Sequence, residues 1–360
     1  MKRKILRVVG FVLAVAFVIA YICYASHLAQ IHRAEQKISD VVISMADSTE
    51  LKQFASSAQI RKLLNKSNLK IEQESIDSID AVRISDYIAR NGFVRDVDVY
   101  VTYSGKLYVD IKQQEPSLRL MCGGLNSYVT EDYDIFRSPQ RSAYYTAVVT
   151  GNYKSHFPRT YEGNVLDYYT SQLAKENVKL ALLGNRFDSL RVRQRICEEQ
   201  KRALRKSSRK RKWEREDNYK QRRVGVMQEM KLIDDQIAAL RLSKEQLKKR
   251  RGVIETHKKK LQKSCDDFTN LINFVTQIKE HSFWGAEIVQ FVADTTSLGD
   301  ITLRLVPRSG NFIIEFGTID NGEQKLSKLQ RFYDEGLSSI GWGEYRKIDV
   351  RYDKQVICTK

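Results

Sequence analysis

Three kinds of hydrophobic pattern follow one another along the chain, and each predicts a different structure. Residues 8–25 (VVGFVLAVAFVIAYICYA) are uncharged and would form a helix ~27 Å long, close to the hydrocarbon thickness of a bilayer. Across residues 36–185 and 264–360, short apolar runs alternate with turn residues, which is typical of α+β structure. Within 186–263, apolar residues recur every three or four positions, as in long helices.

The first pattern predicts a transmembrane helix at residues 8–25. Four basic residues stand before it: Lys2, Arg3, Lys4 and Arg7. The residues after it are balanced in charge, so the positive-inside rule puts residues 1–7 in the cytoplasm and the bulk of the chain outside. A cleaved signal peptide would have a shorter apolar core, followed by a cleavage site with small residues at alternate positions. Here the large residues Tyr21, Ile22 and Tyr24 stand at the end of the apolar run. We therefore expect an uncleaved, single-pass type II anchor.

Residues 36–115 predict a small domain in the order strand, helix, helix, hairpin. The expected elements are an apolar strand at 38–43, a helix at 57–65 capped by Ser56 or Ser57, a helix at 80–90 ended by Asn91-Gly92, and strands at 97–101 and 107–111 joined at Ser104-Gly105. Residues 116–185 and 264–360 predict a β-rich domain in two parts. It would include helices at 268–279 and 323–337 and a last strand at 348–352.

The segment between these two parts, residues 186–263, looks like an inserted helical hairpin. One arm carries a clear apolar stripe, made of Val226, Met230, Ile233, Ile237, Leu240, Leu247, Ile254 and Leu261. A helical seam has two positions in each seven-residue repeat. In the last part of this arm, Leu247, Ile254 and Leu261 occupy one of them, and the other is occupied by Lys244, Arg251 and Lys258. The preceding arm is weaker, with Phe187, Leu190, Cys197 and Leu204. We expect a thin seam, a charged exterior and a turn somewhere in residues 217–225.

The charge of the chain is concentrated in this hairpin. Residues 186–263 hold 27 Lys and Arg against 11 Asp and Glu, whereas the other 282 residues hold 34 against 33. Such a segment favours an anionic partner, namely lipid headgroups, a cell-wall polymer or an acidic protein, and a solvated helical spacer is equally compatible with it. Nucleic acid would also fit the composition of Lys206–Arg215, but the predicted topology puts this run outside the cytoplasm.

No pattern for catalysis, a cofactor or a metal is found. The chain lacks the nucleophile elbow, the zinc-protease motif, the phosphate loop and the dinucleotide-binding loop. Its five histidines are dispersed, and its five cysteines have no metal-ligand spacing. The acidic pairs Asp234-Asp235 and Asp266-Asp267 lie in charged helical sequence, where a solvated face is the simpler interpretation. We predict a non-enzymatic protein that acts by binding.

The last predicted strand offers the best candidate for binding. Ile348, Val350 and Tyr352 would point to one face, and Asp349, Arg351 and Asp353 to the other. A strand so near the carboxyl terminus is expected to leave one edge of its sheet open to an incoming strand. An ordinary edge strand protected by its charges is the alternative.

Several sequence motifs resemble those of the FtsQ family of bacterial cell-division proteins, in the form seen in Bacteroides. The stretch GKLYVDIKQQEP at residues 105–116 is similar to the end of the POTRA domain of that family. The motifs of the carboxyl-terminal part follow in the family's order: Ser282-Phe-Trp284, Leu305-Val-Pro-Arg308, Lys328–Tyr333, Ile348–Asp353 and Gln355–Lys360. The insertion departs from the family pattern, so nothing about its role can be carried over.

The resemblance implies a function. It implies an inner-membrane scaffold of the division machinery, enriched at the septum, with a POTRA domain at 36–115. It also implies that FtsB- and FtsL-type partners add a strand at the carboxyl-terminal edge, where Arg351, Tyr352 and Lys354 would contact them beside Ile348 and Val350, and that binding helps to regulate septal wall synthesis. Two alternatives stay open: a POTRA-bearing secretion or outer-membrane assembly component, and an envelope protein that binds anionic polymer through its hairpin.

Overall fold

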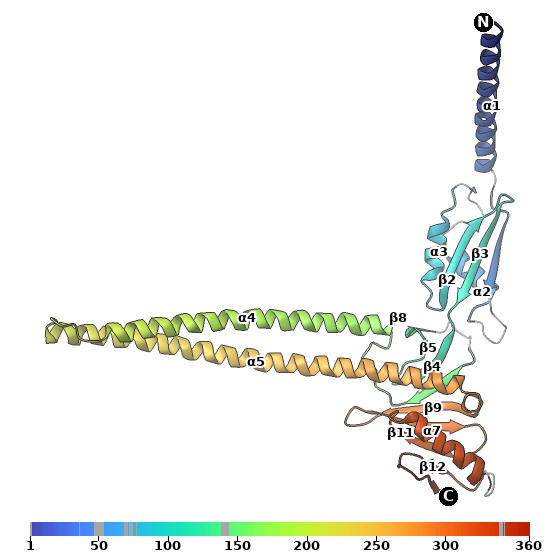
Figure 1. Ribbon diagram of the computed structural model, residues 1–360. Helices are drawn as coiled ribbons and strands as arrows, with labels where there is room; N and C mark the ends of the chain where they lie inside the picture. The colour runs from blue at the N-terminus through green and yellow to red at the C-terminus, as the bar shows by residue number, and fades with distance from the viewer. Residues whose placement is uncertain are drawn as a thin grey trace. The chain divides into compact units, whose positions relative to one another are not determined.

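The computed structural model describes residues 2–35, 37–46, 54–67, 71, 75–76, 78–137, 144–337, 341 and 343–360. The chain divides into two compact units, whose elements are labelled in Figure 1. The sheet unit comprises Met1–Tyr153, Arg159–Gly163 and Ile272–Lys360. The hairpin unit comprises Lys154–Pro158 and Asn164–Leu271.

The chain opens with a long helix, α1 (Lys2–Glu35), which includes the predicted anchor at residues 8–25. Over the part of the chain that the structure describes, no helix has both the length and the apolar character needed to cross a bilayer. The membrane anchor stays a prediction.

The predicted order of strand, helix, helix and hairpin is confirmed in the segment that follows. Its elements are β1 (Asp40–Ala46), α2 (Ser57–Lys66), α3 (Ala81–Ala89), β2 (Val94–Val101) and β3 (Lys106–Gln113). The sheet order is β1-β3-β2, with β1 parallel and β2 antiparallel to β3. Ser56 caps α2 in a capping box with Gln59, and Gly105 turns β2 into β3 with a φ of 78°.

Periodicity explains which residues of this domain are buried. Alternate residues of β3, Leu107, Val109 and Ile111, are fully buried, as strand geometry requires of a sheet with one covered face. They share a core with the apolar faces of α2 and α3. The same core reaches the larger sheet through Phe54, whose ring centroid lies 4.9 Å from that of Tyr128.

The second sheet is built from strands on both sides of the hairpin, as predicted. Its strand order is β13-β12-β11-β10-β9-β7-β4-β5-β6-β8. The strands are β4 (Pro116–Cys122), β5 (Ser127–Thr130), β6 (Asp134–Phe136), β7 (Ala147–Gly151), β8 (Gly163–Asn164), β9 (Ile288–Thr295), β10 (Ile301–Pro307), β11 (Ile313–Gly317), β12 (Lys347–Asp349) and β13 (Ile357–Thr359). The parallel pairing of β7 with β9 joins the two parts, with Val149 opposite Phe291.

Helical segments pack on this sheet. They are α6 (Trp284–Glu287), α7 (Gly322–Arg331), the π-helical turn Phe332–Leu337 and the end, from Ile272, of α5 (Glu216–Glu280). Phe274 of α5 meets Phe316 of β11 with ring centroids 5.0 Å apart, and Trp284 meets Tyr333 at 5.2 Å. These aromatic contacts bury the face of the sheet that carries Leu303 and Leu305.

The hairpin unit consists of α4 (Val165–Ser207) and the part of α5 (Glu216–Glu280) up to Leu271. Its arms run antiparallel (Figure 1), and α4, with 43 residues, is ~65 Å long. Both arms extend beyond residues 186–263, and the helix predicted at 268–279 is the continuous end of α5.

The predicted turn at 217–225 is wrong, because the arms are joined by residues 208–215. Arg222 donates two hydrogen bonds to the Glu214 carboxylate, at 2.8 and 2.7 Å, and these bonds lower the pKa of Glu214 to about 2. Glu216 and Asp217 favour the start of α5 through the helix dipole. Gly225 lies inside the helix, where a β-carbon would meet nothing within 4 Å.

The predicted seam of the hairpin is confirmed. Ile237 and Leu261 are buried, and the other apolar residues of that stripe are partly buried. The seam is interrupted by polar pairs, such as Lys244 Nζ with Gln194 Oε1 at 2.9 Å and the Tyr169 and Ser264 hydroxyls at 2.9 Å. Glu176 is also buried in the seam, where Lys179 Nζ contacts its carboxylate at 2.8 Å.

Candidate partner-binding site

The strand predicted to bind partners lies inside the sheet, not at its edge. Its residues 347–349 form β12, which pairs in parallel with β11 and antiparallel with β13. Ile348 stands opposite Ile314 on one side and Cys358 on the other. The prediction that this strand leaves a free edge is therefore wrong, because the last residues of the chain turn back and cover it.

Two of the five candidate residues belong to the core. Ile348 and Val350 are both fully buried. The Val350 backbone N–H donates to the carbonyl of Glu315 at 3.1 Å, so the residue after β12 still bonds to β11. In the folded chain these two side chains stabilise the sheet and are not available to a partner.

Arg351 is held by Asp349 on the same side of the chain. Its Nε lies 2.9 Å from Oδ1 of Asp349, and its Nη2 lies 2.6 Å from Oδ2. Asp349 is buried, and the hydrogen bonds from Arg351 lower the pKa of its carboxyl below the usual range despite the opposing effect of burial. The bidentate pair fixes the direction of the guanidinium.

A glycine makes room for this arginine. Gly317, at the end of β11, has a φ of 74°, and a β-carbon built on it would lie 2.8 Å from Cγ of Arg351. The aliphatic stem of Arg351 therefore crosses the backbone at Gly317. Its guanidinium carbon lies 6.0 Å from the ring centroid of Tyr352, within the range of a cation–π contact.

The remaining candidates, Tyr352 and Lys354, lie on the connection between β12 and β13. Tyr352 is 47% exposed, and Lys354 is exposed with a left-handed φ of 63°. Lys328 of α7 donates to the carbonyl of Val350 at 2.9 Å and to that of Tyr352. These hydrogen bonds connect the backbone of the turn to α7, whereas the side chains of Tyr352 and Lys354 are exposed to solvent.

The edge of the sheet is β13, which the sequence analysis did not identify as a strand. It is the last strand in the sheet order, so its outer flank has no strand partner among the described residues. Ile357 is 42% exposed, and partial burial raises the pKa of the Cys358 thiol. The available signal was the run of β-branched residues Val356, Ile357 and Thr359 after the Asp353-Lys354 turn.

This arrangement suits recognition of a protein backbone. An open strand edge offers N–H donors and carbonyl acceptors, and Arg351 and Tyr352, on the connection that leads into β13, offer a cation and an aromatic ring. Within the described ranges, no three His, Cys, Asp or Glu side chains are grouped so as to hold a metal ion. Of the acidic pairs noted in the sequence, Asp234 forms an ion pair with Lys201.

Comparison with known proteins yields two family matches. Residues 36–112 match a POTRA-like domain, and residues 222–359 match the family described as FtsQ/DivIB, C-terminal related. The second range begins within α5, so it includes much of the arm that was predicted to depart from the family pattern. No curated protein matches the chain. A POTRA-like domain, followed by a segment that matches the FtsQ/DivIB-related family, supports an FtsQ/DivIB-type protein.

Proposed function

We propose that this protein is a non-enzymatic scaffold of the cell-division machinery that holds small coiled-coil partners of the FtsB and FtsL type at the carboxyl-terminal edge of its large sheet. The observation that carries the proposal is the open flank of β13, preceded in the chain by an exposed Tyr352. A partner strand added there would extend the sheet by backbone hydrogen bonds. Membership of the FtsQ/DivIB type supports a role in cell division.

The burial of the candidate residues changes their roles within this proposal. Tyr352, Lys354 and the exposed part of Arg351 contact the partner. Ile348 and Val350, both fully buried, keep β12 in place so that β13 has a strand to pair with. Strand addition supplies affinity through the backbone, whereas the exposed side chains supply specificity.

The amino-terminal helix anchors this scaffold in the inner membrane, with residues 1–7 in the cytoplasm and the bulk in the periplasm at the septum. The uncharged run at 8–25 and the basic residues before it support this topology. Leu13, Phe17 and Ile22 expose more than half of their side-chain surface, which a soluble helix would tend to bury. The POTRA-like domain and the transmembrane helix place the protein among septal wall synthases, and the partners held at the sheet edge help to time wall synthesis.

The alternative of a secretion or outer-membrane assembly component has less support. A POTRA-like domain alone is compatible with it, but residues 222–359 match the FtsQ/DivIB-related family. That match covers the sheet edge on which the proposal depends.

A single substitution tests the proposed site. Tyr352→Glu places a charge on the connection between β12 and β13 without touching the core, so copurification of the FtsB-type partner should fall at least ~10-fold while the protein stays folded. Tyr103→Glu is the matched control, because Tyr103 is also exposed but lies between β2 and β3, and partner recovery should not change. Undiminished copurification with Tyr352→Glu would refute the site.

A further inference from the structure

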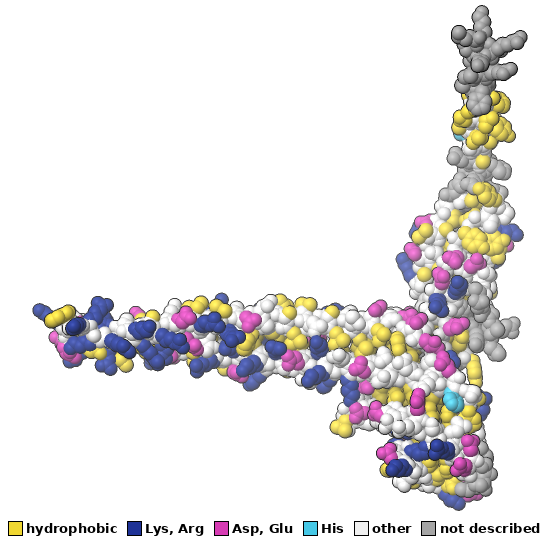
Figure 2. All heavy atoms as spheres, in the orientation of Figure 1, with side chains coloured by type: hydrophobic (Ala, Val, Ile, Leu, Met, Phe, Trp, Pro, Cys, Tyr) yellow, Lys and Arg dark blue, Asp and Glu magenta, His cyan; other side chains and the backbone are white. Residues whose placement is uncertain are grey.

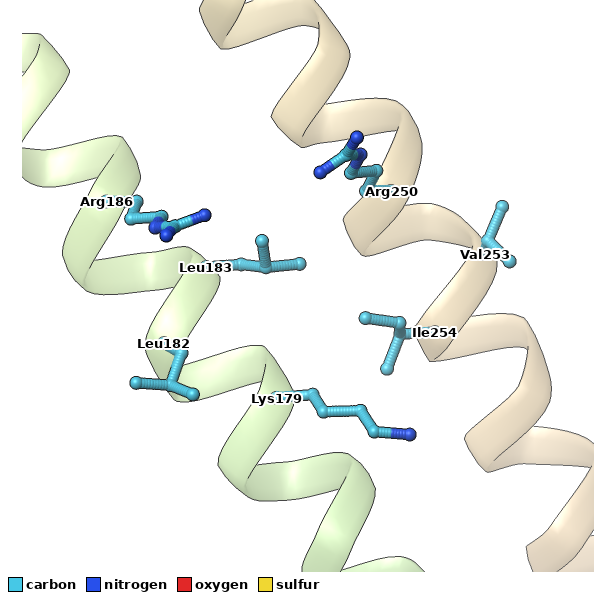
Figure 3. A pocket seen from close by; sticks show the side chains of 7 residues that line it. All are labelled: Lys179, Leu182, Leu183, Arg186, Arg250, Val253 and Ile254. Atoms are coloured by element: carbon cyan, nitrogen blue, oxygen red, sulfur yellow. The ribbon is translucent and has the colours of Figure 1, made fainter.

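A groove runs between the two arms of the hairpin unit, and none of its lining residues is acidic. It has a volume of about 550 Å³ and is lined by Lys179, Leu182, Leu183, Arg186, Arg250, Val253 and Ile254. Figure 3 shows Leu183 and Ile254 facing one another across the groove, with the guanidinium groups of Arg186 and Arg250 directed toward one another at one end. The groove therefore combines an apolar floor with a cationic rim.

The seven-residue repeat of the seam shows how far this face extends. Leu183 and Ile254 are seam residues, and Leu182 and Val253 each stand one position before them. Positions seven apart keep the same place on a coiled hairpin. The equivalent positions are Leu182, Ser189, Ile196 and Ala203 on α4 and Leu232, Ala239, Gln246 and Val253 on α5. All eight are uncharged and exposed.

Residues in steps of seven from Lys179, Arg186 and Arg250 likewise lie on the same side of the hairpin. Between residues 179 and 203 of α4 and between 232 and 253 of α5, the set consists of Lys179, Arg186, Arg193, Gln200, Gln236, Ser243 and Arg250. The set has no acidic residue within these two stretches, and the next positions of the repeat on α5 are Glu229 and His257. Arg186, Arg193 and Arg250 have no ion-pair partner among the residues that the structure describes, whereas Lys179 is paired with Glu176. These fifteen positions together are named the groove face.

The opposite side of the same hairpin carries both acidic and basic residues. Over the same length it carries five acidic residues, Asp188, Glu198, Asp234, Glu245 and Glu255. Three of them form ion pairs within the hairpin, with Lys201, Lys248 and Arg251. The hairpin thus neutralises its charge on one side and leaves cations uncompensated beside exposed apolar residues on the other (Figure 2 shows the Lys and Arg side chains along it).

We propose that the groove face binds a third helix, supplied by a partner protein, whose apolar residues recur on a heptad repeat and whose flanking positions are acidic. A groove between two helices accepts the side-chain ridge of another helix, and the uncharged positions span 22 residues of α4, or ~30 Å. Carboxylates along that helix would meet Arg186, Arg193 and Arg250. A second copy of this chain fits poorly, because its own groove face carries the same charge.

The test uses the full chain in nanodiscs of zwitterionic lipid and a fluorescent peptide of about four heptads, with Leu at the two seam positions and Glu at the flanking ones. A matched peptide carries Lys in place of Glu. We expect the acidic peptide to bind and the basic peptide not to bind. The double substitution Leu182→Glu with Val253→Glu should weaken binding at least ~10-fold, because it places charge on the exposed apolar positions of the groove face.

The control has the same change in charge away from the groove face. Val192→Glu with Leu242→Glu alters two residues that are 53% and 64% exposed and lie outside the groove face, so binding should stay within about twofold. A charge exchange adds a second readout: Arg186→Glu with Arg250→Glu should lose the acidic peptide and gain the basic one. Helical circular dichroism checks that each variant is folded.

Three results would overturn the proposal. Equal weakening by the groove variant and the control variant would show attraction to net charge alone. Binding of anionic vesicles with no binding of the peptide would assign the face to a membrane surface. Sedimentation showing dimers that Leu182→Glu with Val253→Glu dissolves would assign it to self-association.

Discussion

The Asp349–Arg351 pair is the residue-scale feature on which the sheet edge depends. A buried carboxylate has to be hydrogen-bonded, because its desolvation is otherwise costly. Arg351 satisfies both carboxylate oxygens, and its backbone N–H adds a third bond to Oδ1 at 3.1 Å. The pair closes the end of β12 at the point where the chain turns toward β13.

The lowered pKa of Asp349 gives this pair a defined pH dependence. The ionised carboxylate stabilises the fold above the ordinary carboxyl pKa of about 4, and the contribution is lost as pH falls through the lowered pKa of the folded state. Asp349→Asn should therefore reduce stability at pH 7 by about 1.5–3 kcal/mol, with the difference from the parent shrinking below about pH 4. Unfolding of the sheet unit at pH 7 and below pH 4, followed by the fluorescence of buried Trp284, measures the stability difference at each pH.

Asp353→Asn is the matched control for that experiment. Asp353 is exposed, and its replacement should leave stability within about 0.5 kcal/mol at either pH. A difference for Asp349→Asn that did not change with pH would contradict the linkage.

Gly317 and Arg351 should be energetically coupled. In Gly317→Ala the new methyl group would lie 2.8 Å from Cγ of Arg351 and 3.0 Å from its Cδ, in addition to the strain of the left-handed φ. Truncation in Arg351→Ala removes both atoms. The destabilisation caused by Gly317→Ala should thus be smaller in the Arg351→Ala background, with a coupling of about 0.5–3 kcal/mol in a double-mutant cycle. Strict additivity would show that the arginine stem does not lie over this glycine.

At the scale of the element, α4 and α5 contain three glycines that no close packing contact requires. Gly184, Gly225 and Gly252 lie within α4 and α5, and a β-carbon at any of them would meet nothing within 4 Å. Glycine in a helix interior is destabilising by about 0.5–1 kcal/mol relative to alanine. These positions can therefore accept alanine without a steric cost.

The expected result is a more stable hairpin. Replacing the three glycines by alanine should slow amide hydrogen exchange in peptides from residues 165–271 by about 2–5-fold per substitution. Gly285→Ala is the opposite control, because its β-carbon would lie 2.2 Å from the carbonyl oxygen of Lys279 and should destabilise the sheet unit. Unchanged exchange in the triple variant would mean that the seam, not helix propensity, limits the stability of the hairpin.

At the scale of the whole molecule, the register of the hairpin decides where it can be shortened. Arg186 and Arg250 line the same groove, and Tyr169 bonds to Ser264. Removing residues 187–249 and joining the ends with a short turn keeps these facing positions together. Removing residues 186–263 would instead join Asn185 to Ser264 and leave the α4 residues after Tyr169 without their partners in the seam.

We expect the first deletion to leave the sheet unit folded and copurification of the FtsB-type partner unchanged, because β12, β13 and Tyr352 belong to the other unit. The second deletion should lower the thermal stability of the remaining hairpin, since α4 would lose its partner along residues 170–185. Loss of partner binding in the register-matched deletion would contradict the proposed site and favour the hairpin as the functional element.

The sequence by itself determined the structure that local periodicity encodes. The order of elements in the POTRA-like domain, the Ser56 cap, the Gly105 turn and the apolar seam of α5 were all predictable, because each depends on residues within a few positions of one another. The concentration of charge in one segment was likewise visible from counting residues.

Only the tertiary structure decided which strand lies at the edge of the sheet and which side of the hairpin keeps its cations uncompensated. A strand is an edge strand only if no distant segment pairs with it, and β13 pairs with β12 after a turn that periodicity does not reveal. The groove face likewise depends on the alignment of α4 with α5, which is set by contacts between residues far apart in the sequence, such as Gln194 with Lys244 and Tyr169 with Ser264. Local pattern specifies an element, whereas pairing between distant elements specifies which of its surfaces are free.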